Sequence, residues 1–443
     1  MSATARSSYD SRVTLRAASI KVSGAAAVIA AVGIVYQQAA LSYFFNDDFQ
    51  WLQRAREFRL IDLFDLARYD HFYRPVIEIY FSLGRRLFGC AARPFHVASV
   101  AIHLINTLLL FEFAASLSRR RVFAFLTAVF FAVQPAYVEA VAWVAAITDL
   151  LPATWYLLTL WMHLLFLERG GARLRAASIG AFTLCLLTHE SSATLLPMLV
   201  ALEWSVASEG RLPATRRSAA DRIARYAPFV ALLAGYLAIE YVVNSRSYLI
   251  REGHYAFGWH AVSHIFQYIV SLFVGIRTTA TYVAIAAVTA MLLWRGTPRI
   301  RFFVAWIYVT LAPASFFTWG NASRYMYLPA AGFALLLAAA IVALEQMAKT
   351  RTNPRAARAV AVVVAATLAI RYAVFAKREA DLFRGRTRPY ERLAAAVAGS
   401  NSSRPSAAVV YVDRVLAESV PDSYLDPAAA AARCGGDVRV LIQ

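Results

Sequence analysis

The chain has 443 residues, of which 60% are hydrophobic and 16% charged, and this balance excludes an ordinary soluble domain. The formal net charge of +18 is high, but the arginines fall in short clusters between apolar segments, which favours membrane lipid over nucleic acid as their partner. The three cysteines have no metal-binding spacing, although Cys90 and Cys434 can pair if both lie outside the membrane. The composition predicts a multi-pass membrane protein.

The first apolar segment, residues 22–42, follows a basic stretch and is either a signal peptide or a retained anchor. We expect an anchor, with residues 1–21 as a cytoplasmic tail, because the adjacent acids Asp47 and Asp48 follow directly. An aspartate beside a bilayer is costly unless it faces water or a cation, so this pair indicates a functional site. Apolar residues mixed with charges through residues 44–95 predict a first outer loop with interfacial helices.

Further apolar segments of spanning or nearly spanning length follow the first loop. They should all be helices, because an open sheet cannot satisfy its backbone in lipid. We therefore expect an all-α polytopic domain over residues 22–375, with about eleven transmembrane helices. The ten later segments are residues 97–117, 122–136, 150–167, 176–188, 191–206, 227–243, 278–294, 302–318, 328–347 and 358–375.

Basic clusters orient these helices, because short cytoplasmic loops retain Arg and Lys. The clusters occur at every second loop, at residues 119–121, 169–175, 211–225, 295–301 and 349–358. Residues 260–276 would break this alternation if they spanned the membrane, so we interpret them as an external or re-entrant amphipathic helix. The outer loops then contain the polar residues Glu139, Asp149, His189, Glu190, Arg324, Tyr325 and Tyr327.

Six short motifs follow one another over about residues 40–345: NDDF, YRPV, HVASVAIHLIN, QPAYVEAVAWVAAITDLL, THESSATLLP and SRYMYLP. In this order they resemble the GT-C superfamily of membrane glycosyltransferases, and within it the O-mannosyltransferase-like branch. Two departures are visible. Gln134 stands where the family usually has His before Pro, and the C-terminal tail lacks the tetratricopeptide period that members of this branch often carry.

The resemblance implies an enzyme that moves a sugar from a polyprenyl-phosphate donor to a protein or glycolipid acceptor at the outer membrane face. A carboxylate in the first outer loop would be the general base, with Asp47 the leading candidate and Asp48 the next. A one-step displacement would invert the anomeric configuration. Arg324 is expected to hold the donor phosphate. The other expected donor- or substrate-binding residues are Arg74, Glu139, Asp149, His189, Glu190, Tyr325 and Tyr327.

Other interpretations of these residues stay open at this point. Arg324 could be an interfacial anchor in an aromatic belt, and acids in outer loops are often only solvated. A divalent cation, Mg or Mn, could be shared by Asp47 or Asp48 and the donor phosphate. His260 and His264 are one helical turn apart and could also share an ion.

Residues 376–443 have a different texture, with two short β-like runs around an Ala-rich helix, and predict a small α/β segment outside the membrane. An odd number of spans places this segment outside, whereas the basic residues beside the last span point inside. The near-exclusive use of Arg over Lys favours a bacterial inner membrane. A cell-envelope glycan polymerase or ligase, and a non-enzymatic transporter or receptor, are the alternative functions.

Overall fold

The computed structural model describes residue 24 and residues 26–69, 71–213, 218–273, 275–320, 322–399, 408–432, 434 and 438–442. The expected cytoplasmic tail, residues 1–21, lies outside the described residues, as do residues 400–407.

Each of the apolar segments expected to span the membrane contains a helix in the described part of the chain. Five of the described helices are long and apolar enough to cross a bilayer, and a bent pair, α5 with α6, makes up to six. The protein is therefore an all-α, multi-pass membrane protein. In chain order its bundle contains Ala26–Tyr36, α4 (Ala92–Ser118), α5 (Arg121–Ala132), α6 (Val138–Ala142), α7 (Ile147–Arg169), α8 (Ala172–Leu186), α9 (Leu195–Ser208), α10 (Ala219–Asn244), α13 (Thr279–Arg295), α14 (Pro298–Ser315), α15 (Tyr327–Lys349) and α16 (Pro354–Gly399).

Several of these helices are shorter than their apolar segments, because the chain forms 3-10 turns at one end of them. The turns are η4 (Pro135–Tyr137), η5 (Glu190–Thr194) and η7 (Ser323–Met326). They contain or adjoin the polar residues that the sequence places in outer loops. In η4, proline begins the turn, and the Gln134 side chain accepts the Ala136 N–H. The departure from the family motif at Gln134 thus serves as a local cap.

The first loop folds into two helices, α2 (Asp48–Glu57) and α3 (Pro75–Phe88), joined by short 3-10 turns, η2 (Leu60–Phe64) and η3 (Leu66–Arg68). The two helices pack together, and the rings of Trp51 and Phe81 stack at 5.2 Å. The linking turn exposes apolar side chains, including Ile61 and Phe64. This arrangement fits the helices expected to lie in the membrane interface.

The amphipathic segment expected at residues 260–276 forms α12 (His260–Phe273), which packs against α13 and α14. Its 14 residues rise only about 21 Å, too little to cross a hydrocarbon core of about 30 Å. A short helix, α11 (Tyr248–Arg251), precedes it.

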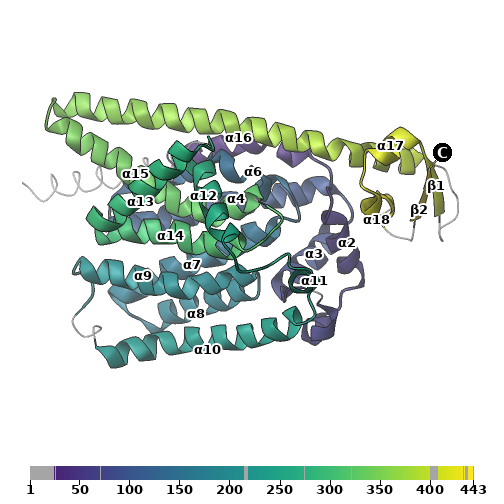
Figure 1. Cartoon of the computed structure of the whole chain (residues 1–443), viewed down its shortest axis with the longest axis horizontal. Coiled ribbons are helices and arrows are strands. Elements are labelled where there is room, and N and C mark those ends of the chain that lie inside the picture. Colours follow the sequence, from purple (N-terminus) through teal and green to yellow (C-terminus); the bar gives the residue numbers. More distant parts are fainter. Residues whose placement is uncertain are drawn as a thin grey trace, which may run out of the picture.

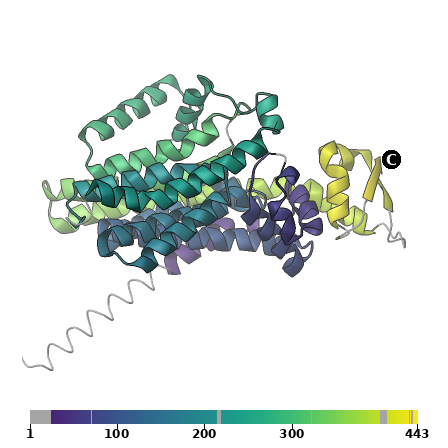
Figure 2. The same ribbon diagram turned by 90° about the horizontal axis from the view of Figure 1, so that it is seen from below.

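Helix α16 is continuous for 46 residues and runs the length of the bundle to the C-terminal segment (Figure 1). That segment contains β1 (Ala408–Val412), α17 (Arg414–Glu418), α18 (Asp422–Ala432) and β2 (Val438–Ile442). The strands pair in parallel, with Val410 opposite Val440, as expected for a small α/β unit. Figure 2 shows the unit projecting beyond the end of the bundle.

The C-terminal segment lies at the end of the bundle that carries the first loop, α2 and α3 (Figure 1). A disulfide joins Cys90, beside that loop, to Cys434, and the Cα atoms of the two residues are 5.3 Å apart. We call the end of the bundle that carries α2, α3 and the C-terminal segment the first-loop end. The C-terminal segment and the first loop therefore lie on the same side of the membrane.

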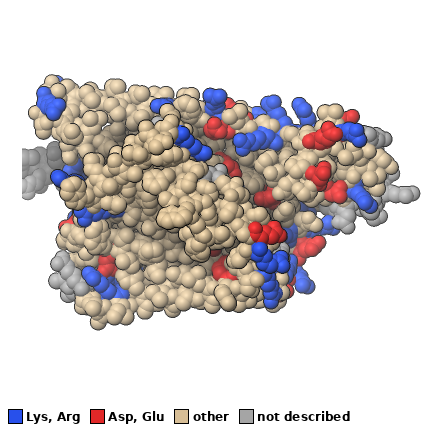
Figure 3. Space-filling view, in the orientation of Figure 1, with Lys and Arg blue, Asp and Glu red and all other residues tan. Residues whose placement is uncertain are grey.

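The charged residues on the visible face gather toward the two ends of the molecule, and few interrupt the region between them (Figure 3). A broad apolar region between charged ends is the surface expected for contact with lipid acyl chains.

Candidate active site

The turn before α2 is built around Asp48, a fully buried carboxylate. Its Oδ2 accepts the Phe45 N–H at 2.8 Å, and its Oδ1 accepts the Ala145 N–H at 2.6 Å. Asn46 has a φ of 46°, in the left-handed region that an asparagine tolerates well. Burial raises the pKa of Asp48 well above its usual range, against the opposing effect of the two amide donors. Asp48 therefore fixes the turn, and both its oxygens are engaged by the protein backbone.

Asp47 is presented by that turn and is only half-buried. Its Oδ1 accepts a hydrogen bond from the Tyr424 hydroxyl at 2.6 Å. The preceding carbonyl, Phe45 O, accepts the indole N–H of Trp143 at 2.9 Å. Of the two adjacent acids, Asp47 is the one that can meet a substrate.

Arg324 lies against the ring of Trp143, with its guanidinium carbon 5.1 Å from the ring centroid. Its Nη1 donates to Glu139 Oε1 at 2.9 Å, and its Nε is 3.7 Å from Asp149 Oδ2. Glu139 also accepts the Ser323 hydroxyl at 2.6 Å. Three residues from two outer-loop motifs thus form one ion cluster, in which each side chain keeps 10 to 22% of its surface exposed.

A second cluster forms around Arg74. Its Nε and Nη2 donate to the two oxygens of Glu190 at 2.9 and 2.7 Å, a forked pair, and Nη2 also contacts His189 Nε2 at 3.0 Å. The other ring nitrogen, Nδ1, accepts the Ser191 N–H at 3.1 Å and lies 2.8 Å from Ser191 Oγ. Burial, followed by the charge of Arg74, lowers the pKa of His189 to about 3. Burial alone would raise the pKa of Glu190, but the charge and hydrogen bonds of Arg74 together with the other neighbouring donors lower it.

The two clusters meet at one cavity of about 210 Å³. Its wall combines polar side chains with apolar ones, and the apolar ones include Leu237, Leu249 and Phe317. The residues expected from sequence that line it are Asp149, His189, Glu190, Arg324, Tyr325 and Tyr327. Glu139 and Arg74 contact this wall from behind, through their ion pairs, whereas Asp47 and Asp48 are not among the lining residues.

Tyr327 lines the cavity, but its hydroxyl points to the interior of the bundle. It accepts the Asn106 side-chain amide at 3.1 Å and lies 2.9 Å from His103 Nδ1. His103 Nε2 faces Ala132 O at 3.2 Å. His103 is therefore a hydrogen-bonded core histidine, and Tyr327 contributes its ring to the cavity.

Glu240, on α10, is a further acid of the cavity wall that the sequence analysis does not single out. It accepts the Tyr73 N–H at 3.0 Å and the Tyr236 hydroxyl at 2.7 Å. It is the only charged residue in the apolar segment 227–243, and an isolated carboxylate inside a spanning segment is a signal for function.

The two histidines of α12 do not assemble a metal centre with other side chains. The rings of His260 and His264 are 5.5 Å apart, and they face the carbonyls of Phe316 and Ser315 at 3.3 and 3.1 Å. Within the described residues, no three His, Cys, Asp or Glu side chains converge on a point that could hold an ion. A divalent cation remains a prediction from the family resemblance.

Comparison with solved structures identifies the fold. ArnT from Cupriavidus metallidurans in the apo state matches with a TM-score of 0.53 at 13% identity, covering 96% of this chain and 86% of ArnT. The same enzyme bound to undecaprenyl phosphate matches with a TM-score of 0.50 at 14% identity, covering 93% and 88% of the two chains. This chain has the GT-C fold. The likeness in fold extends over nearly the whole length of both chains.

Sequence comparison adds a local match. The chain is 34% identical over 101 residues to mouse protein O-mannosyl-transferase TMTC1, a match that spans 23% of this chain and 11% of the mouse protein. No protein-family model matches the chain. The local match supports the O-mannosyltransferase-like branch to which the sequence motifs are similar.

Proposed function

We propose that this chain is a membrane glycosyltransferase that moves a sugar from a polyprenyl-phosphate donor to a nucleophile on a protein or glycolipid. The observation that carries the proposal is the position of Trp143. Its indole N–H binds the turn that presents Asp47, and its ring lies against the guanidinium of Arg324 on the cavity wall. One side chain thus links the turn that presents the proposed base to the proposed phosphate-binding group. ArnT, with the same fold, binds undecaprenyl phosphate, which supports a lipid-phosphate donor.

The chemistry follows from these positions. Asp47 removes the proton from the acceptor as the acceptor oxygen bonds to the anomeric carbon, and the bond from that carbon to the donor phosphate breaks. The electron pair leaves with the polyprenyl phosphate, whose new charge Arg324 stabilises. Glu139 holds the guanidinium in the resting site, and the phosphate takes its place during turnover. Attack opposite the leaving group inverts the anomeric configuration.

Asp48 and the second cluster have supporting roles in this scheme. Asp48 sets the geometry of the turn, because each of its oxygens already accepts a backbone N–H. Arg74 and Glu190 shape the far wall of the cavity, where the sugar or the first prenyl units would lie. A divalent cation would add positive charge at the donor phosphate, but no step of the scheme is assigned to it.

The reaction is assigned to the outer face of the membrane. The first loop and the C-terminal segment share the Cys90–Cys434 disulfide, and disulfides persist in oxidising compartments such as the bacterial periplasm. The basic clusters at every second loop assign the opposite end of the bundle to the cytoplasm. Both observations support a multi-pass protein of the bacterial inner membrane with an outward-facing site.

The test uses membranes that contain the full chain and radiolabelled polyprenyl-phosphate sugars, with lipid and protein acceptors separated afterwards. We expect label transfer by the wild type and a loss of about 10²- to 10⁴-fold in Asp47→Asn at equal expression. Asp65→Asn is the matched control, because Asp65 lies in the same loop and only caps a turn through the Ala67 N–H. The acceptor fraction that gains label identifies the acceptor class.

Two results would contradict the proposal. Transfer that persists in Asp47→Asn would show that Asp47 is not the general base. Absence of transfer from every donor would favour a receptor or transporter. Retention of the donor's anomeric configuration in the product would contradict the one-step displacement.

A further inference from the structure

The C-terminal segment covers the turn that presents Asp47. Tyr424, on α18, donates its hydroxyl to Asp47 Oδ1 at 2.6 Å across 377 residues of sequence. Tyr390, on the extension of α16, donates to the side chain of the neighbouring Asn46. Thr387 Oγ1 accepts the Tyr43 N–H at 3.2 Å. Three contacts therefore join the last part of the chain to residues 43–47.

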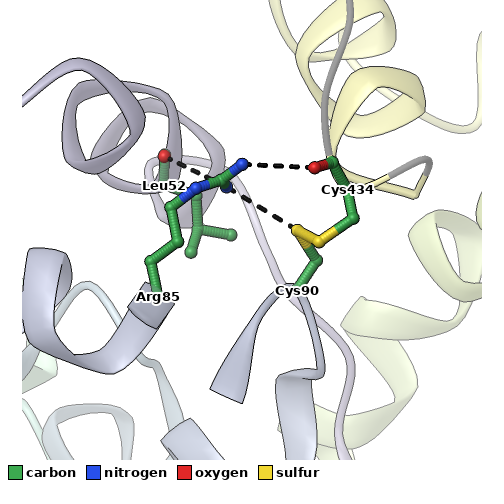
Figure 4. Close-up of a disulfide and its surroundings, with 4 residues drawn as sticks. All are labelled: Leu52, Arg85, Cys90 and Cys434. Carbon is green, nitrogen blue, oxygen red and sulfur yellow. Dashed lines mark hydrogen bonds between the residues drawn. A yellow bond between two sulfur atoms is a disulfide. The ribbon is translucent and has the colours of Figure 1, made fainter. Parts of the chain in front are cut away.

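The disulfide fixes this arrangement from the other side (Figure 4). Cys434 follows α18, and Cys90 follows α3, so the bridge closes a loop over 344 residues. Arg85 lies beside the bridge and donates to Cys434 O at 3.3 Å and to Leu52 O at 3.5 Å. Helix α18 packs against α2 at the same place. The segment is thus held at two points, by the continuous α16 and by the bridge.

The Tyr424 hydroxyl remains a donor throughout the working pH range. Burial, followed by the hydrogen bond and charge of Asp47, raises the pKa of Tyr424 far above neutrality. Its neighbours Leu425 and Ala428 are buried in the segment's own core, which limits the movement of the ring. A fixed phenol on one carboxylate oxygen orients the other oxygen.

We propose that Tyr424 is a positioning residue for sugar transfer, held on Asp47 by the Cys90–Cys434 disulfide. This inference rests on the proposed role of Asp47 as the base. Tyr424 binds Oδ1, so the acceptor proton goes to Oδ2, and the C-terminal segment forms one wall of the acceptor entrance. The segment is then part of the enzyme, and oxidation of the cysteine pair completes the site.

A pH profile separates positioning from general stability. The titratable groups that face Asp47 are Asp48 on its own helix, Tyr248 on α11, Tyr390 on α16 and Tyr424 on α18. A carboxylate that loses a hydrogen-bond donor holds its proton to a higher pH. Removing the phenol should therefore move the acidic limb of the rate profile to higher pH.

The experiment compares Tyr424→Phe with Tyr411→Phe in the full-length protein in membranes. Tyr411 is the matched control, because it lies on β1 of the same segment with 59% of its surface exposed. We expect Tyr424→Phe to lower kcat about tenfold or more, with the donor KM unchanged. Its acidic limb should move to higher pH than that of Tyr411→Phe. Thiol labelling that still finds Cys90 and Cys434 oxidised shows that the variant is folded.

The bridge is tested in the same assay. The double variant Cys90→Ser/Cys434→Ser should lose activity to a similar extent, and reductant should lower the wild-type rate to the same level. Cys185→Ser is the control, because Cys185 is buried and unpaired.

The outcomes keep the two proposals apart. If Asp47→Asn is inactive while Tyr424→Phe matches Tyr411→Phe in kcat and pH profile, the positioning role is wrong and the proposed function stands. If Asp47→Asn is fully active, the proposed function fails first. A double cysteine variant with wild-type kcat would show that the bridge does not hold Tyr424 in place.

Discussion

Two acid–arginine pairs lie at opposite ends of the bundle and look alike in sequence. At the end away from the first loop, Arg225 on α10 donates to Glu203 on α9, and Tyr226 donates to the same carboxylate at 2.8 Å. The Arg225 and Glu203 side chains are only 4 and 5% exposed. At the first-loop end, Arg324 and Glu139 are 22 and 20% exposed, and Arg324 lines the cavity.

The difference shows that a buried ion pair is no marker of function by itself. The Arg225–Glu203 pair joins two helices and is closed to solvent. The Arg324–Glu139 pair keeps part of each group accessible and places the guanidinium against aromatic rings. Accessibility to a cavity is the property that separates a reactive pair from a structural one.

The largest effect is expected from Arg225→Ala. It removes the buried partner of the Glu203 carboxylate and leaves Tyr226 and the exposed Arg222, so the cost in folding free energy is expected at up to about 3–5 kcal/mol. We expect a large fall in thermal stability and protein abundance, measured by thermal unfolding in detergent. The kcat per folded molecule should stay near the wild-type value. A selective loss of kcat with an unchanged unfolding temperature would show that the Arg225–Glu203 pair acts in catalysis and not in the fold.

Arg324→Gln should have the opposite signature. Loss of the group that stabilises the leaving phosphate should lower kcat by about 10²- to 10³-fold, the range found for a single transition-state donor. The unfolding temperature should change little, because the side chain is partly solvated. The measurement is single-turnover transfer with normalised protein, and an equal loss in a conservative Glu203→Gln variant would show that both pairs act through the fold.

Acid should weaken the first-loop end through the buried His189. The unfolded chain binds a proton at His189 near pH 6.5, whereas the folded chain binds it only near pH 3. Between these values the unfolded state holds more protons, so stability falls as the pH falls. From pH 7 to pH 5 the expected loss is about 2 kcal/mol. His189→Gln should flatten this dependence in urea or thermal unfolding, and an unchanged slope would contradict the neutral, Arg74-bound histidine.

The smallest effect is expected from Glu240→Gln. The carboxylate accepts from Tyr73 and Tyr236 on the cavity wall, and an amide can accept only at its oxygen. We expect an increase of about tenfold or less in the donor KM, with little change in kcat. Steady-state kinetics with varied donor concentration provide the measurement, and a larger effect on kcat would place Glu240 at the reacting atoms.

Much of the site is predictable from sequence because its parts follow local rules. Apolar periodicity and the basic loops place Glu139, Asp149 and Arg324 at one end of the bundle, and the structure brings these three together. The helix lengths are less predictable, because apolar segments such as 191–206 begin with a 3-10 turn that composition does not reveal.

The rest depends on contacts between distant parts of the chain. Asp47 and Asp48 are adjacent and chemically alike in sequence, and contacts from distant segments distinguish them: the Ala145 amide binds Asp48, whereas the Tyr424 hydroxyl binds Asp47. The Tyr424 contact crosses almost the whole chain, so no local pattern announces it. Glu240 was detectable in principle as a lone charge in an apolar segment, but its alignment with the cavity required the packed structure.

The length of the continuous helix α16 determines how far the C-terminal segment lies from the bilayer. Its 46 residues correspond to about 69 Å, more than twice a hydrocarbon core of about 30 Å. One part of the helix therefore lies in the bilayer, and the other part extends beyond it and carries the C-terminal segment. Because the Cys90–Cys434 disulfide ties the same segment to the first loop, a bilayer of different thickness would tilt or lift α16 and the first loop together.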